Sequence, residues 1–152
     1  MKISLKNTIY STLLIFILSA CSHVKLVGPY DEIVDNTVNQ LHADTTAHFS
    51  KILSNKGKND GSYETLKEFY MNVQGKVDTL IVRASVLEKG LSKTPLTKNF
   101  KMLKEQYKDL AEIHQTPFNE GVINSAKKAF DQPYRSIIKH IVYLKWNQKQ
   151  PE

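Results

Sequence analysis

The stretch LKEFYMNVQGKVDTLIVRASVL, residues 66–87, decides the fold that we expect for this chain. Its apolar residues recur at alternating steps of four and three, which places them along one face of an α-helix. That stripe consists of Leu66, Tyr70, Val73, Val77, Leu80, Ala84 and Leu87, with Phe69 and Ile81 beside it. Ser62 is the candidate N-cap, and Gly90 suits the left-handed residue that ends many helices. Gly75 lies inside this helix, either at a close contact with another helix or on a surface that tolerates it.

Three further segments have the same period. The stripe before residue 66 consists of Val34, Val38, Leu41, Thr45, His48 and Ile52, widened by Ile33 and Phe49. The two later stripes are Leu96, Phe100, Leu103, Tyr107, Leu110 and His114, and then Val122, Ala126, Ala129, Phe130, Ile137, Ile141 and Leu144. Thr94-Pro95 and Thr116-Pro117 are predicted to begin these two helices, each with a threonine cap and proline at the first helical position. The loop NKGKNDGS, residues 55–62, has two glycines and no apolar residue, which is typical of a turn.

Four amphipathic segments joined by short connections predict an all-α fold. Short connections favour antiparallel neighbours, so we expect an antiparallel, up-down-up-down four-helix bundle. Pro133 interrupts the last segment and should kink that helix, because proline lacks a hydrogen-bond donor and crowds the preceding turn. The alternative is an elongated helical hairpin that dimerises, because sustained heptads also suit a coiled coil.

The composition is that of an ordinary globular chain, since 41% of its 152 residues are hydrophobic and 24% are charged. The formal charge is +6, and removing Lys2 and Lys6 of the N-terminal segment leaves +4 for the rest. That mild excess suits contact with an anionic membrane surface and argues against nucleic acid, which calls for a clustered basic stripe. The single cysteine excludes an intrachain disulfide, and no Cys/His array for structural zinc is present in the sequence.

The N-terminal segment has the three-part layout of a secretory signal. MKISLK supplies two lysines, NTIYSTLLIFIL supplies the apolar centre, and LSAC closes it with small residues before the only cysteine. The dense apolar stretch, residues 13–18, is far shorter than the ~20 residues that a transmembrane helix needs. A permanent transmembrane anchor is therefore not expected.

The sequence LSAC, Leu18 to Cys21, resembles the lipobox of bacterial lipoprotein precursors. The resemblance implies that the Cys21 sulfur carries a diacylglycerol, that the signal is cut before Cys21, and that the new amino group is acylated. Two or three acyl chains hold a protein firmly on a membrane. Ser22, in place of an aspartate, implies an outer-membrane protein that faces the periplasm. The predicted organisation is a signal peptide (1–20), a lipidated cysteine with a short tether (21–29), a helical domain (30–148) and a polar tail (149–152).

No motif of nucleophilic catalysis stands out, so we expect a protein that is not an enzyme. His48 and His114 both fall on apolar stripes, and Met102 lies next to Leu103. Helical bundles can hold heme through such residues, which makes a heme- or metal-binding bundle in the periplasm the alternative function. The sequence has no Cys-x-x-Cys-His and no Glu-x-x-His pair. We expect no cofactor besides the lipid, because a histidine on an apolar face is more often a core residue with a hydrogen-bond partner.

The last helix ends in a basic, aromatic-rich segment whose candidate partner-binding residues are Tyr134, Arg135, Lys139, Tyr143 and Trp146. Trp, Tyr and Arg are favoured at protein contacts and at the membrane interface. We favour the other interpretation, in which the aromatic residues pack in the core and the lysines are solvated. We expect the domain to bind or scaffold another envelope protein at the membrane surface, where the lipid raises its effective concentration. The sustained heptads also leave a homodimer open.

Overall fold

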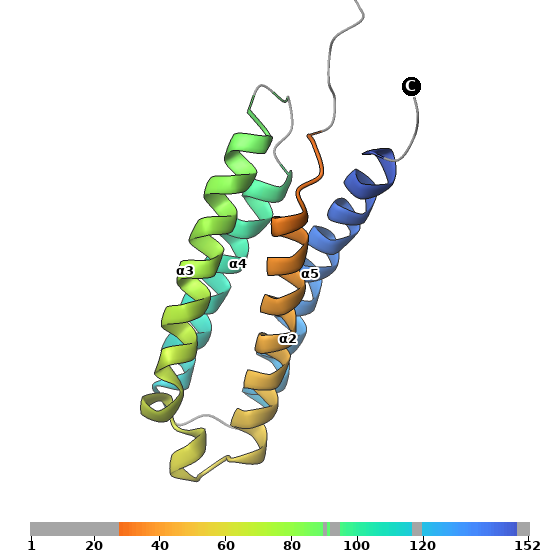
Figure 1. The fold of residues 1–152 in the computed structure, drawn as a ribbon. Helices are drawn as coiled ribbons and strands as arrows, with labels where there is room; N and C mark the ends of the chain where they lie inside the picture. The colour runs from red at the N-terminus through yellow and green to blue at the C-terminus, as the bar shows by residue number, and fades with distance from the viewer. Residues whose placement is uncertain (1–27, 90, 92–94, 117–119, 149–152) are drawn as a thin grey trace, which may run out of the picture.

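A computed structural model of the chain describes residues 28–148 apart from 90, 92–94 and 117–119 (Figure 1). Within these residues lie four long α-helices and one short 3₁₀ turn: α2 (Glu32–Ser54), η1 (Asn59–Gly61), α3 (Tyr63–Leu87), α4 (Pro95–His114) and α5 (Glu120–Gln148). No strand occurs in this part of the chain, so the predicted all-α class is confirmed. The predicted signal peptide, Cys21, most of the tether and the polar tail lie outside the described residues.

Polar side chains cap the starts of α2 and α3. The Asp31 carboxylate accepts hydrogen bonds from the amides of Ile33 and Val34, at 2.8 and 3.1 Å. The Ser62 hydroxyl accepts one from the amide of Thr65 at 3.4 Å, which confirms the predicted cap of α3. Each oxygen satisfies an amide that the first turn of a helix leaves unpaired.

The start of α4 is capped by a residue from the end of the preceding helix. This helix begins at Pro95, as predicted, and Thr94 and Gly90 lie outside the described residues. The buried carboxylate of Glu88 accepts hydrogen bonds from the Leu96 amide at 2.9 Å and the Thr97 amide at 3.1 Å. A carboxylate at a helix N-terminus also interacts favourably with the helix dipole.

The predicted start of the last helix, at Thr116-Pro117, adjoins residues 117–119, which lie outside the described part of the chain. This helix begins at Glu120, and the Thr116 hydroxyl donates a hydrogen bond back to the Ile113 carbonyl at 2.9 Å. This hydrogen bond leaves the acceptor side of the hydroxyl untested, because the amides that a cap at Thr116 would bind lie outside the described residues. The predicted cap at Thr116 therefore stays a prediction. Pro117 lies outside the described residues.

The apolar stripes of all four helices meet in one core. Fully buried members from successive helices are Leu41, Val77, Phe100 and Ile137. Full burial of such a side chain stabilises a fold by about 1.5–3 kcal/mol relative to leaving it exposed. The α5 helix continues through Pro133, whose side chain is buried.

The predicted stripes are wrong at a few positions. Ile33 is 55% exposed and Val122 is 39% exposed, whereas Ile123 is fully buried. In α5 the buried positions 123, 130 and 137 are seven residues apart, so position 122 lies one step around the helix from the core. Ala129 is exposed for the same reason. Gly75 is exposed, with no atom within 4 Å of a Cβ built on it, so it belongs to the surface.

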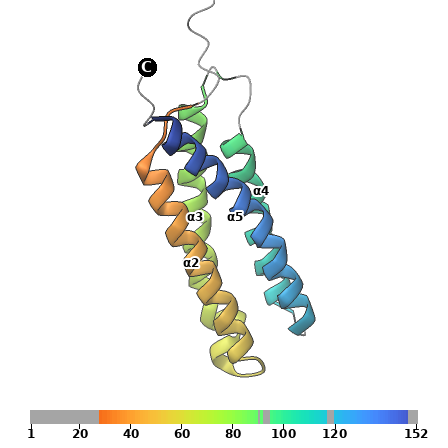
Figure 2. The same cartoon turned by 90° about the vertical axis from the view of Figure 1, so that its right-hand side faces the viewer.

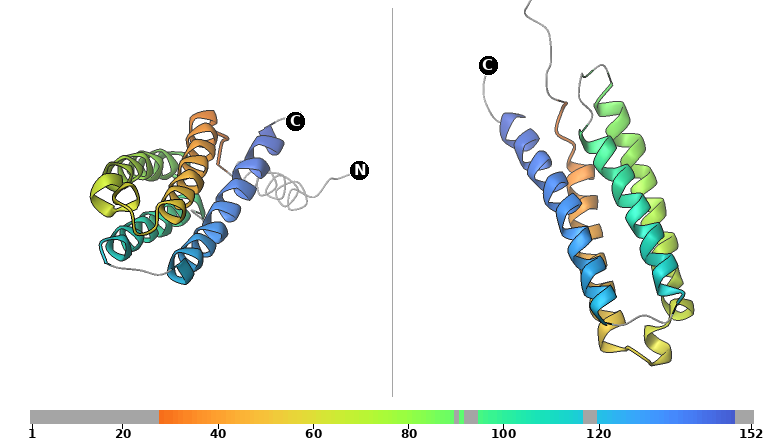
Figure 3. Two further views of the ribbon diagram at one scale, coloured as in Figure 1. Left: turned by 90° about the horizontal axis from the view of Figure 1, so that it is seen from below. Right: turned by 180° about the vertical axis from the view of Figure 1, so that it is seen from behind.

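The helices lie side by side along one long direction. The contacts pair α2 with α3 and α5, and α4 with α3 and α5. Figure 2 shows α5 alongside α2 and α4, and the end-on view of Figure 3 shows α3 on the side of the molecule away from α5. Within the described residues α3 and α5 do not contact each other.

The two ends of the molecule, which we call the loop end and the tether end, are built from different elements. The loop end contains η1, the last turn of α2 and the last turn of α4. There Gly61 is required, because a Cβ on it would lie 2.4 Å from the carbonyl oxygen of Asn55. The tether end contains Gly28, the last turn of α3 and the last turns of α5, which together line one pocket. Arg83 of α3 and Lys145 of α5 join this end to α2 through Asp31 at 2.7 Å and Asp35 at 3.2 Å.

Candidate functional site

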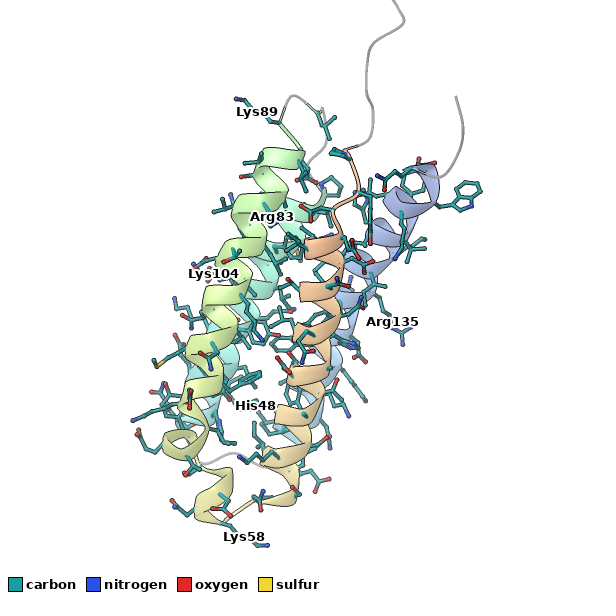
Figure 4. The ribbon with its side chains drawn as sticks, in the orientation of Figure 1. His48, Lys58, Arg83, Lys89, Lys104 and Arg135 are labelled. Carbon is teal, nitrogen blue, oxygen red and sulfur yellow. The ribbon has the colours of Figure 1, made fainter. Side chains whose placement is uncertain are left out.

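The structure brings His48 and His114 together, although they are predicted only as isolated positions on two stripes. The Tyr70 hydroxyl lies between them, 2.9 Å from His48 Nε2 and 2.8 Å from His114 Nδ1. His114 Nε2 lies 2.8 Å from the Gly61 carbonyl oxygen, from which it follows that this nitrogen carries the proton. The two imidazole rings are 6.0 Å apart between centroids. We call His48, Tyr70 and His114 the histidine layer; Figure 4 labels its member on α2, His48.

Aromatic side chains enclose the histidine layer. The His48 ring stacks on Phe69 with centroids 3.7 Å apart and an interplanar angle of 10°. Tyr63 stacks on Tyr70 at 5.6 Å and meets the His114 ring edge-on at 5.9 Å. The histidines are therefore held in a largely apolar environment, with a single hydroxyl between them.

This environment favours the neutral form of both histidines. Burial, with smaller contributions from the nearby His114 and Lys51, lowers the pKa of His48 to about 3. Burial also lowers the pKa of His114, against the Gly61 carbonyl, which raises it. Burial raises the pKa of the Tyr70 hydroxyl. The layer is consequently a chain of neutral hydrogen-bonded groups at neutral pH.

A surface pocket of about 700 Å³ adjoins the histidine layer at the loop end. His114, Tyr63 and Gly61 form part of its wall. The remaining lining residues are Ile52, Lys56, Gly57, Lys58, Ser62, Glu64, Gln115 and Thr116. Two lysines and one glutamate give this wall no single charge preference, so the pocket does not point to one class of ligand.

The heme or metal alternative has to be compared with these contacts. His48 Nε2 and both ring nitrogens of His114 lie within hydrogen-bond distance of Tyr70 or Gly61, so a metal would have to displace those bonds. The described residues contain no group of three or more His, Cys, Asp or Glu side chains placed to hold a metal ion. Met102, the predicted companion ligand, is 49% exposed on α4. The geometry gives this alternative no specific support.

A second polar layer lies deeper in the core and has no histidine. The Thr45 hydroxyl contacts the Tyr107 hydroxyl and lies 3.2 Å from the Tyr134 hydroxyl, and the two tyrosine hydroxyls also contact each other. Burial raises the pKa of Tyr107, and it raises the pKa of Tyr134 to about 12. We call these three residues the hydroxyl layer. Each hydroxyl has a partner in both other members of the layer.

The predicted partner-binding residues do not share one surface. Tyr134 is only 1% exposed, and its hydroxyl belongs to the hydroxyl layer, so it is a core residue. Arg135 and Lys139 are exposed on α5, and Figure 4 shows Arg135 pointing away from the other helices. Tyr143 is 48% exposed and Trp146 is 62% exposed near the tether end. The four exposed residues recur at steps of four and three, which places them along one face of α5.

A second pocket, of about 370 Å³, lies at the tether end. Its wall is mainly apolar and consists of Gly28, Pro29, Leu87, Glu88, Leu91, Pro95, Leu96, His140, Tyr143 and Leu144. The pocket brings the start of the described chain next to the aromatic end of α5. Cys21, the predicted lipidation site, lies outside the described residues.

Sequence reasoning missed the roles of Tyr70 and Glu88. Tyr70 and Tyr107 are predicted as ordinary stripe residues, and Glu88 has no predicted role. A signal for the two layers was present in the sequence, because Thr45, His48 and His114 are polar residues at stripe positions. Polar groups at buried positions require hydrogen-bond partners, although the sequence does not say which.

Comparison with protein-family models, with curated proteins and with solved structures gives no match for this chain. Among the described residues, no helix is both long enough and apolar enough to cross a bilayer.

Proposed function

We propose that this chain is a lipid-anchored envelope protein whose helical domain binds or scaffolds a protein partner at the membrane surface, without catalytic activity of its own. The observation that carries the proposal is the composition of the tether end. Gly28, seven residues after Cys21, lines the same pocket as Tyr143, and Trp146 lies one turn further along α5. A lipid on Cys21 would therefore attach next to exposed aromatic side chains.

The length of the tether supports this arrangement. Seven residues of extended chain reach at most about 25 Å, so acyl chains on Cys21 would keep the tether end close to the headgroups. Tyr and Trp favour the interface between headgroups and water. Arg135 and Lys139 lie earlier in α5, one to two turns before Tyr143 and away from the tether end. Both side chains are exposed to a partner approaching from the aqueous side. Ser22 after the predicted lipidated cysteine supports the outer membrane and its periplasmic face.

We also propose that the four helices alternate in direction as an antiparallel bundle, with a bend in α5 at Pro133. Support for alternation comes from contacts that join opposite helix termini. Asp31 at the start of α2 binds Arg83 near the end of α3, and Lys145 near the end of α5 binds Asp35. Pairs of spin labels at exposed positions of α2 and α3 test the direction, because antiparallel and parallel pairs give opposite trends of distance with position.

Replacing the cysteine tests the anchor. The unmodified chain should fractionate with membranes and carry a diacylglycerol at Cys21 in mass spectra. The Cys21→Ala variant should appear in the soluble fraction, because it lacks the sulfur that takes the lipid. As a matched control, Ser22→Asp should stay membrane-bound but move from the outer to the inner membrane. A Cys21 residue found unmodified in the membrane fraction would overturn the anchor.

Site-specific crosslinking tests the partner. A photocrosslinking residue at position 146 or 139 should capture one defined envelope protein in intact cells. The same residue at position 108, exposed on α4, serves as the control and should not capture that protein. Equal capture from positions 108 and 146 would argue against a binding surface on α5.

A further inference from the structure

The outer face of α3 differs from the exposed faces of the neighbouring helix. Opposite the core, four turns of α3 present no charged residue: this outer strip consists of Met71, Gly75, Thr79, Val82 and Val86. Met71, Val82 and Val86 are 69%, 63% and 67% exposed, respectively. The exposed face of α4 instead carries Lys98, Lys101, Glu105, Lys108, Asp109 and Glu112. A contiguous exposed apolar strip commonly marks an interaction site.

No other described element covers the outer strip. The contacts of α3 are with α2, α4 and η1, all of which involve its other faces. Gly75 lies at the centre of the strip, and nothing lies within 4 Å of a Cβ built there. A glycine costs an exposed helix about 1 kcal/mol relative to alanine, and it lets another helix approach closely.

The charges at the two ends of the strip are complementary to each other. Glu68 lies one turn before Met71, and Lys89 lies three residues after Val86, in the turn that follows α3 (Figure 4). The other charged residues of α3 are engaged within the chain, in the pairs Lys67–Glu64, Lys76–Asp44, Arg83–Asp31 and Lys104–Asp78, and through the Glu88 cap. Among the described residues, Glu68 and Lys89 have no ion-pair partner. Glu68 within α3 and Lys89 just beyond its end are thus left for a partner outside the chain.

A second copy of α3 in antiparallel orientation would cover the apolar residues, fill the space at Gly75 and pair both end charges. With a two-fold axis between positions 78 and 79, Glu68 faces Lys89 of the second copy and Met71 faces Val86. Val82 then faces Gly75, whose missing side chain leaves room for it. Asp78 lies beside the axis, and Lys104 holds its carboxylate at 2.6 Å, which offsets the charge that two copies bring together. A parallel pair would instead set Glu68 against Glu68 and Lys89 against Lys89.

We infer that the outer strip of α3 is a self-association surface, through which two copies of this chain pair antiparallel about a two-fold axis. Self-complementarity of one patch is what a two-fold interface requires. The inference does not depend on the lipid anchor, although an anchor would raise the local concentration of the chain. The tethers leave from opposite ends of the pair, so two anchored copies reach one bilayer when α3 lies along its surface.

Disulfide crosslinking of the full chain tests the pairing. Thr79 lies on the strip next to the axis, so Thr79→Cys should give a disulfide-linked dimer in intact cells. Met71→Cys should not crosslink to itself, because positions 71 of the two copies lie far apart in an antiparallel pair. Met71→Cys expressed together with Val86→Cys should restore the dimer. A crosslink of Met71→Cys to itself, no dimer from Thr79→Cys, or a different protein attached at position 79 would each overturn the inference.

Two sets of variants test the cause of the pairing. Gly75→Lys in the Thr79→Cys background should lose the dimer, while its thermal unfolding shows that the helix remains folded, since lysine favours helices more than glycine. Glu68→Lys and Lys89→Glu should each reduce the dimer, and the double variant should restore it. Failure of that restoration would contradict the charge pairing. Fractionation of the same cells reports on the anchor separately, so a failed anchor is distinguished from a failed pairing.

Discussion

The histidine layer and the hydroxyl layer are both buried polar clusters, and they share α2 and α4, on which they lie about one and two turns apart. The third member of the histidine layer comes from α3 and that of the hydroxyl layer from α5. In the hydroxyl layer, Thr45, Tyr107 and Tyr134 all contact one another, so losing one hydroxyl leaves the other two paired. In the histidine layer, the Tyr70 hydroxyl hydrogen-bonds to both imidazoles, and the two rings make no hydrogen bond to each other among the described residues. The comparison shows that the pattern of connections, and not burial alone, decides how sensitive a polar cluster is to substitution.

The layers also differ in their response to acid. Burial raises the pKa values of Tyr107 and Tyr134, so these hydroxyls stay neutral from acidic to mildly alkaline pH. The histidines have lowered pKa values in the folded protein, so protonation is less favourable there than in the unfolded chain. Of the two layers, only the histidine layer therefore makes stability depend on pH in the acidic range.

Tyr70→Phe should have the largest effect, because it leaves one nitrogen of each histidine without its buried partner. We expect a loss of about 3 kcal/mol in the free energy of unfolding, measured by urea denaturation at pH 7. Tyr63→Phe is the matched control, since the Tyr63 hydroxyl makes no hydrogen bond to the described residues. Equal losses from the two substitutions would contradict the linking role of Tyr70.

Lowering the pH from 7 to 5 should destabilise the protein by about 2 kcal/mol through His48 alone. The folded-state pKa of about 3 lies below the ordinary value of 6.5, so the stability from neutral His48 is present above pH 6.5 and is lost as the pH falls toward 3. Urea denaturation at both pH values measures the change. His48→Gln should lower stability at pH 7 and flatten the pH profile, whereas parallel profiles would show that His48 does not cause the dependence.

Tyr107→Phe should cost less than Tyr70→Phe, about 1 kcal/mol, because the Thr45 and Tyr134 hydroxyls remain 3.2 Å apart and can still bond each other. The same denaturation experiment measures this loss. The variant should keep the pH profile of the unmodified protein, because it leaves the histidine layer intact. A larger loss than that of Tyr70→Phe would reverse the comparison between the two layers.

Thr45→Val should have the smallest effect, about 0.5 kcal/mol, because the tyrosine hydroxyls contact each other directly. The Leu41 carbonyl, which accepts from the Thr45 hydroxyl at 2.6 Å, stays within the backbone ladder of α2. Thermal unfolding followed by circular dichroism measures the shift. A cost above that of Tyr107→Phe would show that Thr45 and not the tyrosine pair holds this layer together.

The helices themselves could be predicted because their signals are local. The four-three stripe around Val77 and Leu80 is set by the geometry of a single helix, and it holds wherever that helix packs. The cap at Ser62 and the start at Pro95 are local for the same reason. Val122 shows the limit, since its stripe position was predicted to face the core, whereas Ile123 is the buried residue there.

The candidate sites were predicted less well because they depend on partners from other helices. Tyr134 is of a residue type that is favoured at protein contacts, yet the tertiary structure buries it against Thr45. His48 and His114 were recognised as stripe positions, whereas the hydroxyl that joins them comes from α3. Glu88 carries no sequence signal as a cap, because its partners lie eight and nine residues away across a turn.

The sequence by itself determined that this chain forms four amphipathic helices and most of the residues that face the core, and it showed that residues 1–21 resemble the signal of a lipoprotein precursor. Only the tertiary structure decided which buried polar groups meet, which residue caps α4, and which face of α3 stays uncovered. The physical reason is that periodicity fixes the angular position of a side chain around its own helix. The axial register between neighbouring helices depends on turns and packing, and that register selects every partner.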